Sequence, residues 1–222
     1  MKIAVVIPTL NEAERIVGAI ASATAPDVEV LVVDGGSVDG TRERAVAAGA
    51  RVSTALGGRA RQLAAGVRET RSDAIVFLHA DTRLPPGFAP AMCASLADSR
   101  VVVGAFRFRL DENRFGLRLV EWGARLRAAV LRLPYGDQAL FVRRAALEAI
   151  GGVPQTPIME DLDLVWALRR RGRLTLLSLS ATTSARRYQS AGVLRTVFRN
   201  LAAAAAWRLH IDRERVSAWY RR

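Results

Sequence analysis

The stretch that decides the fold is "IAVVIPTLNEAERIVGAIASATAPDVEVLVVDGG", residues 3–36. Residues 3–8 are a continuous apolar run, which predicts a buried strand. Residues 12–23 place apolar side chains at helical spacing, and residues 28–35 form a second apolar strand. A strand, a helix and a strand in this order predict a parallel sheet that is covered by helices on both faces.

The same alternation continues through the first half of the chain. Residues 39–49 predict a helix that ends at Gly49, "RVSTA" a short strand, "RARQLAAGVRE" a helix and "DAIVFLHAD" a strong strand. Ligands of such sheets bind at the carboxyl ends of the strands. We therefore expect three polar segments to converge at that edge, and these are residues 9–12, 34–39 and 79–81.

The second half of the chain is less regular. Residues 101–110 predict a strand, "QALFVRR" another strand, and "EDLDLVWALRRRG" a helix that is closed by Gly172. The tail, residues 191–222, is mostly helical in pattern. There is no internal repeat, low-complexity linker or sign of a second domain, so residues 1–222 are interpreted as a single domain.

Two stretches predict amphipathic helices that carry arginines opposite an apolar side. Residues 113–133 contain the first, with Phe115, Leu119, Trp122, Leu126, Val130 and Leu133. Residues 193–215 contain the second, with Leu194, Phe198, Leu201 and Leu209. Such helices can lie on an anionic membrane, or they can pack against the sheet or a dimer partner. Packing is the favoured interpretation.

Composition favours a cytoplasmic protein. No run of 18 or more uninterrupted apolar residues predicts a spanning helix, and the apolar run at the N-terminus is too short for a secretion signal. Cys93 is the single cysteine, so no internal disulfide is possible. The net charge is +12, but the arginines are spread along the chain, which does not favour nucleic-acid binding.

The turns after the first two strands have a purely structural and a functional interpretation. In "IPTLNE", Asn11 or Glu12 can cap the next helix after Pro8 ends the strand. In "VDGGSVDGT", Asp34 stands at a strand end and Gly36 allows close backbone approach. A glycine-rich turn into a helix suits a nucleotide, although a tight turn alone has the same pattern.

Three later segments carry candidate chemistry. In "LHADT", Asp81 is an oxygen ligand suited to Mg²⁺ or Mn²⁺, while His79 is a second ligand, a phosphate or sugar contact, or a structural residue. In "PIMEDLDL", an ionised Asp161 can serve as a general base, or the carboxylates there only favour the helix start. The polar loop "SARRYQSAG" has Arg186 and Arg187, which can bind phosphate or lie on the surface.

The order of these blocks resembles the family-2 glycosyltransferases. The series is "IPTLNEAERI", "VDGGSVDGT", "GGRARQLAAG", "FLHADT", "GDQALFVRR" and "MEDLDL", and it covers residues 1 to about 190. The family consists of inverting enzymes with a GT-A fold that use a nucleotide-activated sugar. The chain is most similar to a short, soluble bacterial branch, some of whose members are linked to arsenosugar biosynthesis.

The resemblance implies an α/β, Rossmann-like, mostly parallel sheet with an amphipathic helix insert and a helical tail. It divides the domain into a nucleotide-sugar-binding half (1–110), an acceptor-side and catalytic half (111–190) and the tail (191–222). It also implies one sugar per reaction, because the Gln-x-x-Arg-Trp signature of processive polymerases is absent.

The implied site residues fall into four groups. The catalytic base is Asp161, beside Glu160, and the metal ligand for Mn²⁺ or Mg²⁺ is Asp81. The residues implied to bind the nucleotide-sugar, a UDP-sugar by preference, are Pro8, Thr9, Asn11, Glu12, Asp34, Gly36, Arg59, Gln62, His79, Ala80 and Asp81. Those on the acceptor or diphosphate side are Gly136, Asp137, Gln138, Arg186 and Arg187.

The acceptor stays open between a small molecule and a lipid phosphate, and so do a homodimer and peripheral contact with the inner membrane face. Two other functions compete with sugar transfer. A nucleotidyltransferase would need a glycine-rich, lysine-bearing loop after the first strand, which "IPTLNE" is not. A non-catalytic basic module would bind nucleic acid or membrane with a strong salt dependence.

Overall fold

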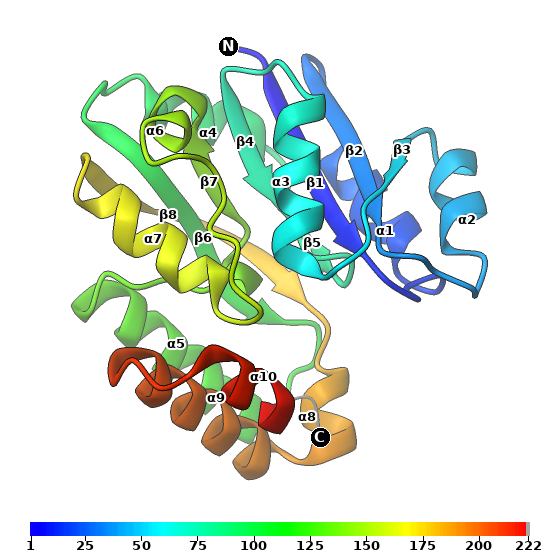
Figure 1. Cartoon of the computed structure of the whole chain (residues 1–222). Coiled ribbons are helices and arrows are strands. Elements are labelled where there is room, and N and C mark those ends of the chain that lie inside the picture. Colours follow the sequence, from blue (N-terminus) through cyan, green and yellow to red (C-terminus); the bar gives the residue numbers. More distant parts are fainter. Residues whose placement is uncertain (221–222) are drawn as a thin grey trace.

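The computed structural model describes residues 1–220 as an α/β fold around one mixed sheet (Figure 1). Its strands run in the order β3-β2-β1-β4-β7-β6-β8-β5. Their bounds are β1 Ile3–Thr9, β2 Val28–Asp34, β3 Arg51–Thr54, β4 Ala74–Phe77, β5 Thr82–Arg83, β6 Val101–Leu110, β7 Leu140–Arg143 and β8 Arg173–Thr183.

Helices cover both faces of this sheet and form a further layer below it (Figure 1). Their bounds are α1 Ile16–Ala23, α2 Thr41–Ala47, α3 Arg59–Glu69, α4 Phe88–Leu96, α5 Phe115–Val130, α6 Arg144–Glu148, α7 Glu160–Arg169, α8 Arg186–Ala191, α9 Val193–Arg208 and α10 Arg213–Tyr220. A short 3-10 turn, η1, spans Gly136–Gln138. The α/β class and the helical tail are as predicted.

The first half of the sheet is parallel, as the sequence predicts. β1 lies between β2 and β4 and is parallel to both, and β2 is parallel to β3. In the β1–β2 register, Ile3 pairs with Val28 and Thr9 with Asp34. The carboxyl ends of these strands therefore meet at one edge, where the predicted polar segments follow them.

The second half adds antiparallel pairings to the sheet. β7 is antiparallel to β4 and to β6, whereas β8 is parallel to β6 and antiparallel to β5. The sequence patterns predict neither the strand at residues 173–183 nor the helix at residues 88–96. The prediction of a loop at 184–192 is wrong over most of its length, because α8 occupies Arg186–Ala191.

Two apolar cores lie on opposite faces of the sheet. On one face, α1 and α4 contribute Ile16, Ile20 and Met92. On the other face, α3 and α7 contribute side chains that include Leu63 and Leu164. Alternate side chains of β1 enter the two cores, since successive residues of a strand point to opposite faces.

Helix α3 lies unusually close to the centre of the sheet. A Cβ added at Gly66 would lie 2.3 Å from Cγ1 of Val6, so only glycine fits between α3 and β1. This close packing holds the N-terminus of α3, with Arg59, beside the carboxyl ends of the central strands.

For the first amphipathic stretch, the predicted packing of its apolar stripe against the sheet is wrong, while its packing against a dimer partner stays a prediction. Helix α5 buries Leu117, Glu121 and Ala128 instead, and Phe115 is 81% exposed. The reason is that α5 has apolar residues on more than one side, and periodicity does not tell which side faces inward.

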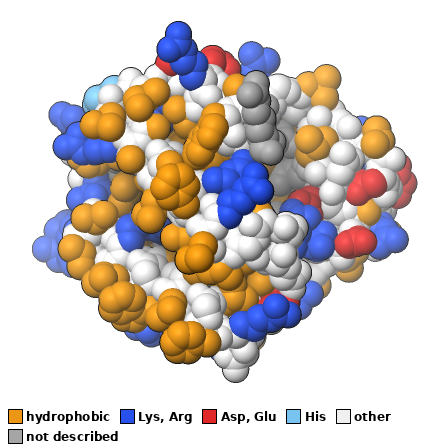
Figure 2. Space-filling model, turned by 90° about the horizontal axis from the view of Figure 1, so that it is seen from below, with side chains coloured by type: hydrophobic (Ala, Val, Ile, Leu, Met, Phe, Trp, Pro, Cys, Tyr) orange, Lys and Arg blue, Asp and Glu red, His pale blue; other side chains and the backbone are white. Residues whose placement is uncertain are grey.

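Helix α9 has the same orientation, with Leu194 86% exposed. The two helices lie in the lower layer in Figure 1, and Figure 2 views the molecule from that side, with hydrophobic side chains gathered across it. We call this surface the α5–α9 face; its exposed apolar residues are Phe115, Leu119, Trp122, Leu126, Val130, Leu194, Phe198 and Leu201. Within residues 1–220, no helix combines the length and the apolar character needed to cross a membrane.

Candidate active site

The turns after β1 and β2 are interlocked by hydrogen bonds. The Asn11 amide donates to Oγ of Ser37 (2.9 Å), and Oδ1 of Asn11 accepts from the Val38 amide (3.0 Å). The Glu12 amide donates to Oγ1 of Thr41 at 2.9 Å. The predicted convergence of residues 9–12 and 34–39 is therefore confirmed. Asn11 adopts a left-handed φ of 55°, which asparagine tolerates better than most residues.

Asp34 is completely buried and uses its carboxylate to hold its own turn. Oδ2 accepts from the amides of Gly36 (2.9 Å) and Ser37 (3.0 Å), and Oδ1 accepts from Oγ of Ser37 (2.5 Å). Gly36 adopts a left-handed φ of 98°. The contact of Asp34 with a base or ribose stays a prediction; its structural role is visible in these bonds.

Gln62 joins the carboxyl ends of two central strands. Its buried Nε2 donates to the carbonyl oxygens of Thr9 (2.7 Å) and Val33 (2.9 Å). The Thr9 hydroxyl is buried and has no hydrogen-bond partner among the described residues. Pro8 pairs with Val33 inside the sheet, and Ala80 is buried in the core behind the edge.

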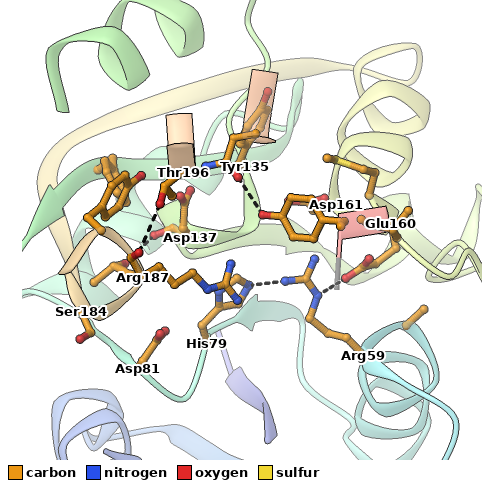
Figure 3. Close-up of a pocket in the computed structure, with 18 of the residues that line it drawn as sticks. Arg59, His79, Asp81, Tyr135, Asp137, Glu160, Asp161, Ser184, Arg187 and Thr196 are labelled. Atoms are coloured by element: carbon orange, nitrogen blue, oxygen red, sulfur yellow. Dashed lines mark hydrogen bonds and ion pairs between the residues drawn. The ribbon is translucent and has the colours of Figure 1, made fainter. Parts of the chain in front are cut away.

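A cavity of about 300 Å³ opens beside this edge, where the sheet meets α7, α8, α9 and α10 (Figure 3). Among the predicted site residues, those that line it are Arg59, His79, Asp81, Asp137, Glu160, Asp161 and Arg187. The remaining predicted residues do not line it, namely Pro8, Thr9, Asn11, Glu12, Asp34, Gly36, Gln62, Ala80, Gly136, Gln138 and Arg186. The topology thus brings the metal, base and arginine candidates to one cavity.

Arg59 links two of the predicted motifs across the cavity floor. Its Nε forms an ion pair with Oε1 of the buried Glu160, and its Nη1 lies 3.2 Å from Nε2 of His79 (Figure 3). Burial lowers the pKa of Arg59, but the carboxylates of Glu160 and Asp161 outweigh this effect and raise it overall. Arg59 is therefore a permanent cation in the cavity.

His79 is a neutral imidazole near pH 7. Burial first, and then the positive charges of Arg59 and Arg187, hold the pKa of His79 well below its usual range. Its Nε2 faces Arg59, so this nitrogen is engaged by the guanidinium.

Asp161 is fixed at the first turn of α7 by two backbone donors. Oδ2 accepts from the Gly136 amide (2.7 Å) and Oδ1 from the Leu162 amide (3.0 Å). Two carboxylate oxygens offer about four lone-pair sites, so Asp161 can still accept a proton or a hydroxyl group from the cavity. A Cβ added at Gly136 would lie 2.9 Å from Nε2 of His79 and 3.2 Å from Oδ2 of Asp161, which makes Gly136 a close-packed spacer between them.

Asp137 is a further carboxylate of the cavity, and one of its oxygens, the buried Oδ1, has no hydrogen-bond partner among the described residues. Burial, reinforced by the negative charges of Asp161 and Asp81, raises the pKa of Asp137 to about 6, against the opposing effect of Arg127 and Arg187. Gln138, by contrast, is buried and donates to the Phe106 carbonyl (3.0 Å), so it braces the turn.

The backbone is strained on both sides of the cavity. Ala139, after η1, has a φ of 47°, and Met159, before α7, has a φ of 64°. Non-glycine residues pay a conformational cost in this left-handed region, and such residues occur often at functional sites. Met159 directly precedes Glu160, and Ala139 lies two residues after Asp137, so both strained residues flank carboxylates that line the cavity.

Asp81 is the predicted ligand for a divalent cation, and its neighbours in the structure can be compared with that prediction. Its Oδ2 lies 3.4 Å from Nη2 of Arg186, which also forms an ion pair with Oε1 of Glu12. Within residues 1–220, no group of three or more His, Cys, Asp or Glu side chains could hold a metal ion. This set fits Mg²⁺ or Mn²⁺ only in the mode where one carboxylate, substrate phosphates and water complete the coordination.

Sequence reasoning missed the residues that close the cavity from the second half of the chain. They are Phe108, Tyr135, Ile158, Met159, Thr183, Tyr188, Thr196, Asn200 and Tyr220, with Ser184 at the rim. Tyr135 directly precedes the "GDQ" block, and this position beside predicted site residues could have indicated that it lines the cavity. Thr196, Asn200 and Tyr220 come from the tail, where the periodicity showed only helices, and Tyr220 donates to Oδ1 of Asn200 at 2.7 Å.

The tail also holds the helix that carries the catalytic candidates. Trp207 of α9 donates through Nε1 to Oδ1 of Asp163 (2.7 Å), and Arg213 of α10 reaches the same oxygen (3.2 Å). Trp207 further packs edge-on against Trp166 of α7, with ring centroids 5.9 Å apart. The tail is therefore a structural part of the cavity.

Similar solved structures share this fold. The chain aligns with glucosyl-3-phosphoglycerate synthase from Mycobacterium tuberculosis, in complex with Mn²⁺, UDP and phosphoglyceric acid, with a TM-score of 0.66 and 22% identity, over 95% of this chain and 79% of that one. It aligns with S. aureus TarS 1-349 in complex with UDP-GlcNAc with a TM-score of 0.65 and 16% identity, over 83% of this chain and 58% of that one.

A curated relative is the undecaprenyl-phosphate 4-deoxy-4-formamido-L-arabinose transferase of Pseudomonas aeruginosa. It is 27% identical over 165 residues, which is 67% of this chain and 49% of the relative. The chain thus spans about half the length of the curated relatives it matches. The model of the family described as Glycosyl transferase family 2 matches residues 4–147. With a GT-A fold and that match over more than half of its length, the chain belongs to glycosyl transferase family 2.

Proposed function

We propose that this chain is an inverting transferase that moves one sugar, a hexose by preference, from a nucleotide-sugar to a hydroxyl or phosphate acceptor. A UDP-sugar is the favoured donor. The observation that carries the proposal is the cavity itself, which is lined by the carboxylates of Asp81, Asp137 and Asp161 and by the cations of Arg59 and Arg187. Carboxylates and cations that converge at the carboxyl end of a sheet suit the transfer of an anionic, polar substrate.

The donor would lie across the interlocked turns and into the cavity. Its nucleoside would contact the segments 8–12 and 34–36, which form a preorganised surface through their mutual hydrogen bonds. Its diphosphate would lie near Asp81, Arg186 and Arg187. A divalent cation bound there through Asp81 would supply Lewis-acid neutralisation of the leaving diphosphate.

Asp161 would act as the base on the acceptor. The Gly136 and Leu162 amides fix its carboxylate, which faces the cavity and can take the proton from an attacking hydroxyl. Glu160 would act on Arg59, whose cation stays in place through that ion pair. His79 would remain uncharged, so it would contact the donor without adding positive charge.

The acceptor is proposed to carry a phosphate group. The Pseudomonas relative is named for undecaprenyl phosphate, and the Mycobacterium structure holds phosphoglyceric acid, which has a phosphate as well. In this chain, Arg187 is exposed and lines the cavity, so its guanidinium can bind an anion there, whereas Arg59 is already paired with Glu160. A lipid phosphate and a small phosphorylated molecule share this chemistry. The arsenosugar-linked branch and the cytoplasmic location stay predictions.

The test is a thermal-shift screen with UDP-, GDP- and dTDP-sugars, each with and without Mn²⁺. A ligand that binds only the native state stabilises it and so raises the melting temperature. At 100 times its Kd, such a ligand adds about 2.7 kcal/mol to the free energy of unfolding. We expect one nucleotide class to stabilise the chain and EDTA to abolish both that shift and turnover. If no nucleotide-sugar shifted the melting temperature, the proposal would be contradicted. Full activity in metal-free buffer would exclude the role of the divalent cation but not the transfer reaction.

A further inference from the structure

The α5–α9 face is too apolar and too exposed to be an ordinary water-facing surface. Phe115, Trp122 and Phe198 are 81%, 61% and 69% exposed, and the leucines between them are exposed as well. Contiguous apolar patches of this kind mark interaction sites on soluble proteins. The face is built on a packed base, because the inner side of α5 lies on Phe108, Leu110 and Ala185.

The charged groups of these two helices are of one sign. Helix α9 contains no acidic residue, and the single acid of α5, Glu121, is buried against Arg118, with Nη1 2.8 Å from Oε2. Arg125, Arg195 and Arg208 are exposed and have no ion pair or hydrogen bond with any described residue. Figure 2 shows the blue side chains around and within the apolar groups, while red ones lie mainly at one margin.

We propose that the α5–α9 face docks on the surface of an anionic lipid bilayer. Amphipathic helices that carry Trp, Phe and Leu on one side and arginine on the other bury their apolar side at the headgroup boundary. Each cation near an anionic leaflet adds attraction that salt screens. A second copy of the chain fits less well, because both surfaces of a twofold contact would be positively charged and neither α5 nor α9 offers an exposed acidic residue to pair with arginine.

The α5–α9 face lies close to the cavity, so docking on a membrane would also position the cavity near the bilayer. Helix α9 presents Leu194, Phe198 and Leu201 outward, while Thr196 and Asn200 of the same helix line the cavity. A membrane-bound chain would thus hold its cavity close to the phosphate groups of the bilayer. This consequence rests on the proposed transfer reaction, whereas the docking itself does not.

The experiment is flotation of the chain with vesicles of equal parts phosphatidylcholine and phosphatidylglycerol, at low salt and without nucleotide-sugar. We expect the chain to float with these vesicles, to float less as salt rises, and to stay at the bottom with pure phosphatidylcholine. Failure to float with the anionic vesicles at low salt would overturn the proposal. Since no donor is present, that failure would leave the transfer reaction untouched.

Paired variants test whether this face is the one that binds. Trp122→Ser with Phe198→Ser should weaken vesicle binding at least tenfold, because each buried aromatic side chain contributes more than the free energy of a tenfold change, about 1.4 kcal/mol. Arg125→Gln with Arg195→Gln should weaken binding and flatten its salt dependence. The matched controls are Val17→Ser with Val46→Ser, and Arg42→Gln with Arg68→Gln, which change exposed residues on other helices. Equal loss in the controls would overturn the assignment.

Sedimentation velocity without vesicles tests whether a second copy of the chain, instead of a membrane, covers the α5–α9 face. We expect a monomer for the wild type and for Trp122→Ser with Phe198→Ser. A dimer that these two substitutions dissociate would place a second copy on the α5–α9 face and contradict membrane docking.

Discussion

The turns on the donor side and the cavity beside them use the same residue type in opposite ways. Asp34 accepts three hydrogen bonds from its own turn and is fully buried. Asp137 leaves a buried oxygen without a partner among the described residues, and burial raises its pKa to about 6. A satisfied carboxylate stabilises the fold, whereas an unsatisfied one is costly and is retained where a substrate can use it. The difference separates the carboxylate that holds the donor-side turn from a carboxylate of the cavity that is open to a substrate.

The largest expected effect is on Asp161. Asp161→Asn keeps the size of the side chain but cannot take a proton, so turnover should fall about 100- to 10,000-fold. Asparagine has a single acceptor oxygen, so it can accept from the Gly136 amide or from the Leu162 amide but not from both, and the melting temperature should fall modestly. Donor binding should change little. The measurement is steady-state kinetics beside donor titration, and turnover equal to the wild type would remove Asp161 from the role of base.

A smaller loss of turnover should follow from Gly136→Ala. The new Cβ would lie 2.9 Å from Nε2 of His79, so His79 or Asp161 must shift. Misplacement of a catalytic group by about 1 Å can cost about 100-fold, and we expect a loss of roughly 10- to 100-fold. The control is Gly123→Ala on α5, where no atom lies within 4 Å and the helix should become slightly more stable. Unchanged kcat in Gly136→Ala would show that the spacing is not critical.

On the structural side of the comparison, Asp34→Ala should unfold more easily. It leaves the amides of Gly36 and Ser37 without their acceptor, at a cost of about 1–3 kcal/mol for a buried unsatisfied group. Chemical denaturation measures this directly. Asp39→Ala is the matched control on the next turn, since the Asp39 carboxylate accepts from the Ala13 and Thr41 amides at 3.1 Å but is not fully buried. Equal stability of Asp34→Ala and the wild type would contradict the structural role of Asp34 and so its difference from the cavity carboxylate Asp137.

The smallest effect concerns the pH dependence of stability. The pKa of Asp137 is raised from 3.8 to about 6 in the folded chain, so the native state binds more protons than the unfolded state between these values. The unfolding free energy should therefore fall as pH rises from about 4 to 6, by about 1–3 kcal/mol. Asp137→Asn should lack this component. The difference between the two denaturation curves is the readout, and parallel curves would contradict the raised pKa.

The first half of the fold could be predicted because its signals are local. The unbroken apolar runs of β1, β2 and β4 and the helical spacing of α3 specify a parallel sheet, and that topology forces the polar ends of the strands together. Asp34, Asp81 and Asp161 could be named from the order of motifs along the chain.

The second half depends on contacts that sequence spacing does not encode. The contribution of Tyr220 and Asn200 to the cavity depends on where α9 and α10 pack, and the outward orientation of α5 depends on which of its apolar sides meets Phe108 and Leu110. The satisfied state of Asp34 and the unsatisfied state of Asp137 also become visible only when their neighbours are in place.

The most direct test of the account is the anomeric configuration of the first sugar released from an α-linked UDP-sugar. Proton NMR can follow enzyme-dependent donor hydrolysis, in which water replaces the unknown acceptor, before the free sugar mutarotates. Direct attack assisted by Asp161 from the face opposite the leaving diphosphate predicts the β anomer first, and its loss in Asp161→Asn. Initial release of the α anomer would contradict the inverting mechanism and the role of Asp161 as its base.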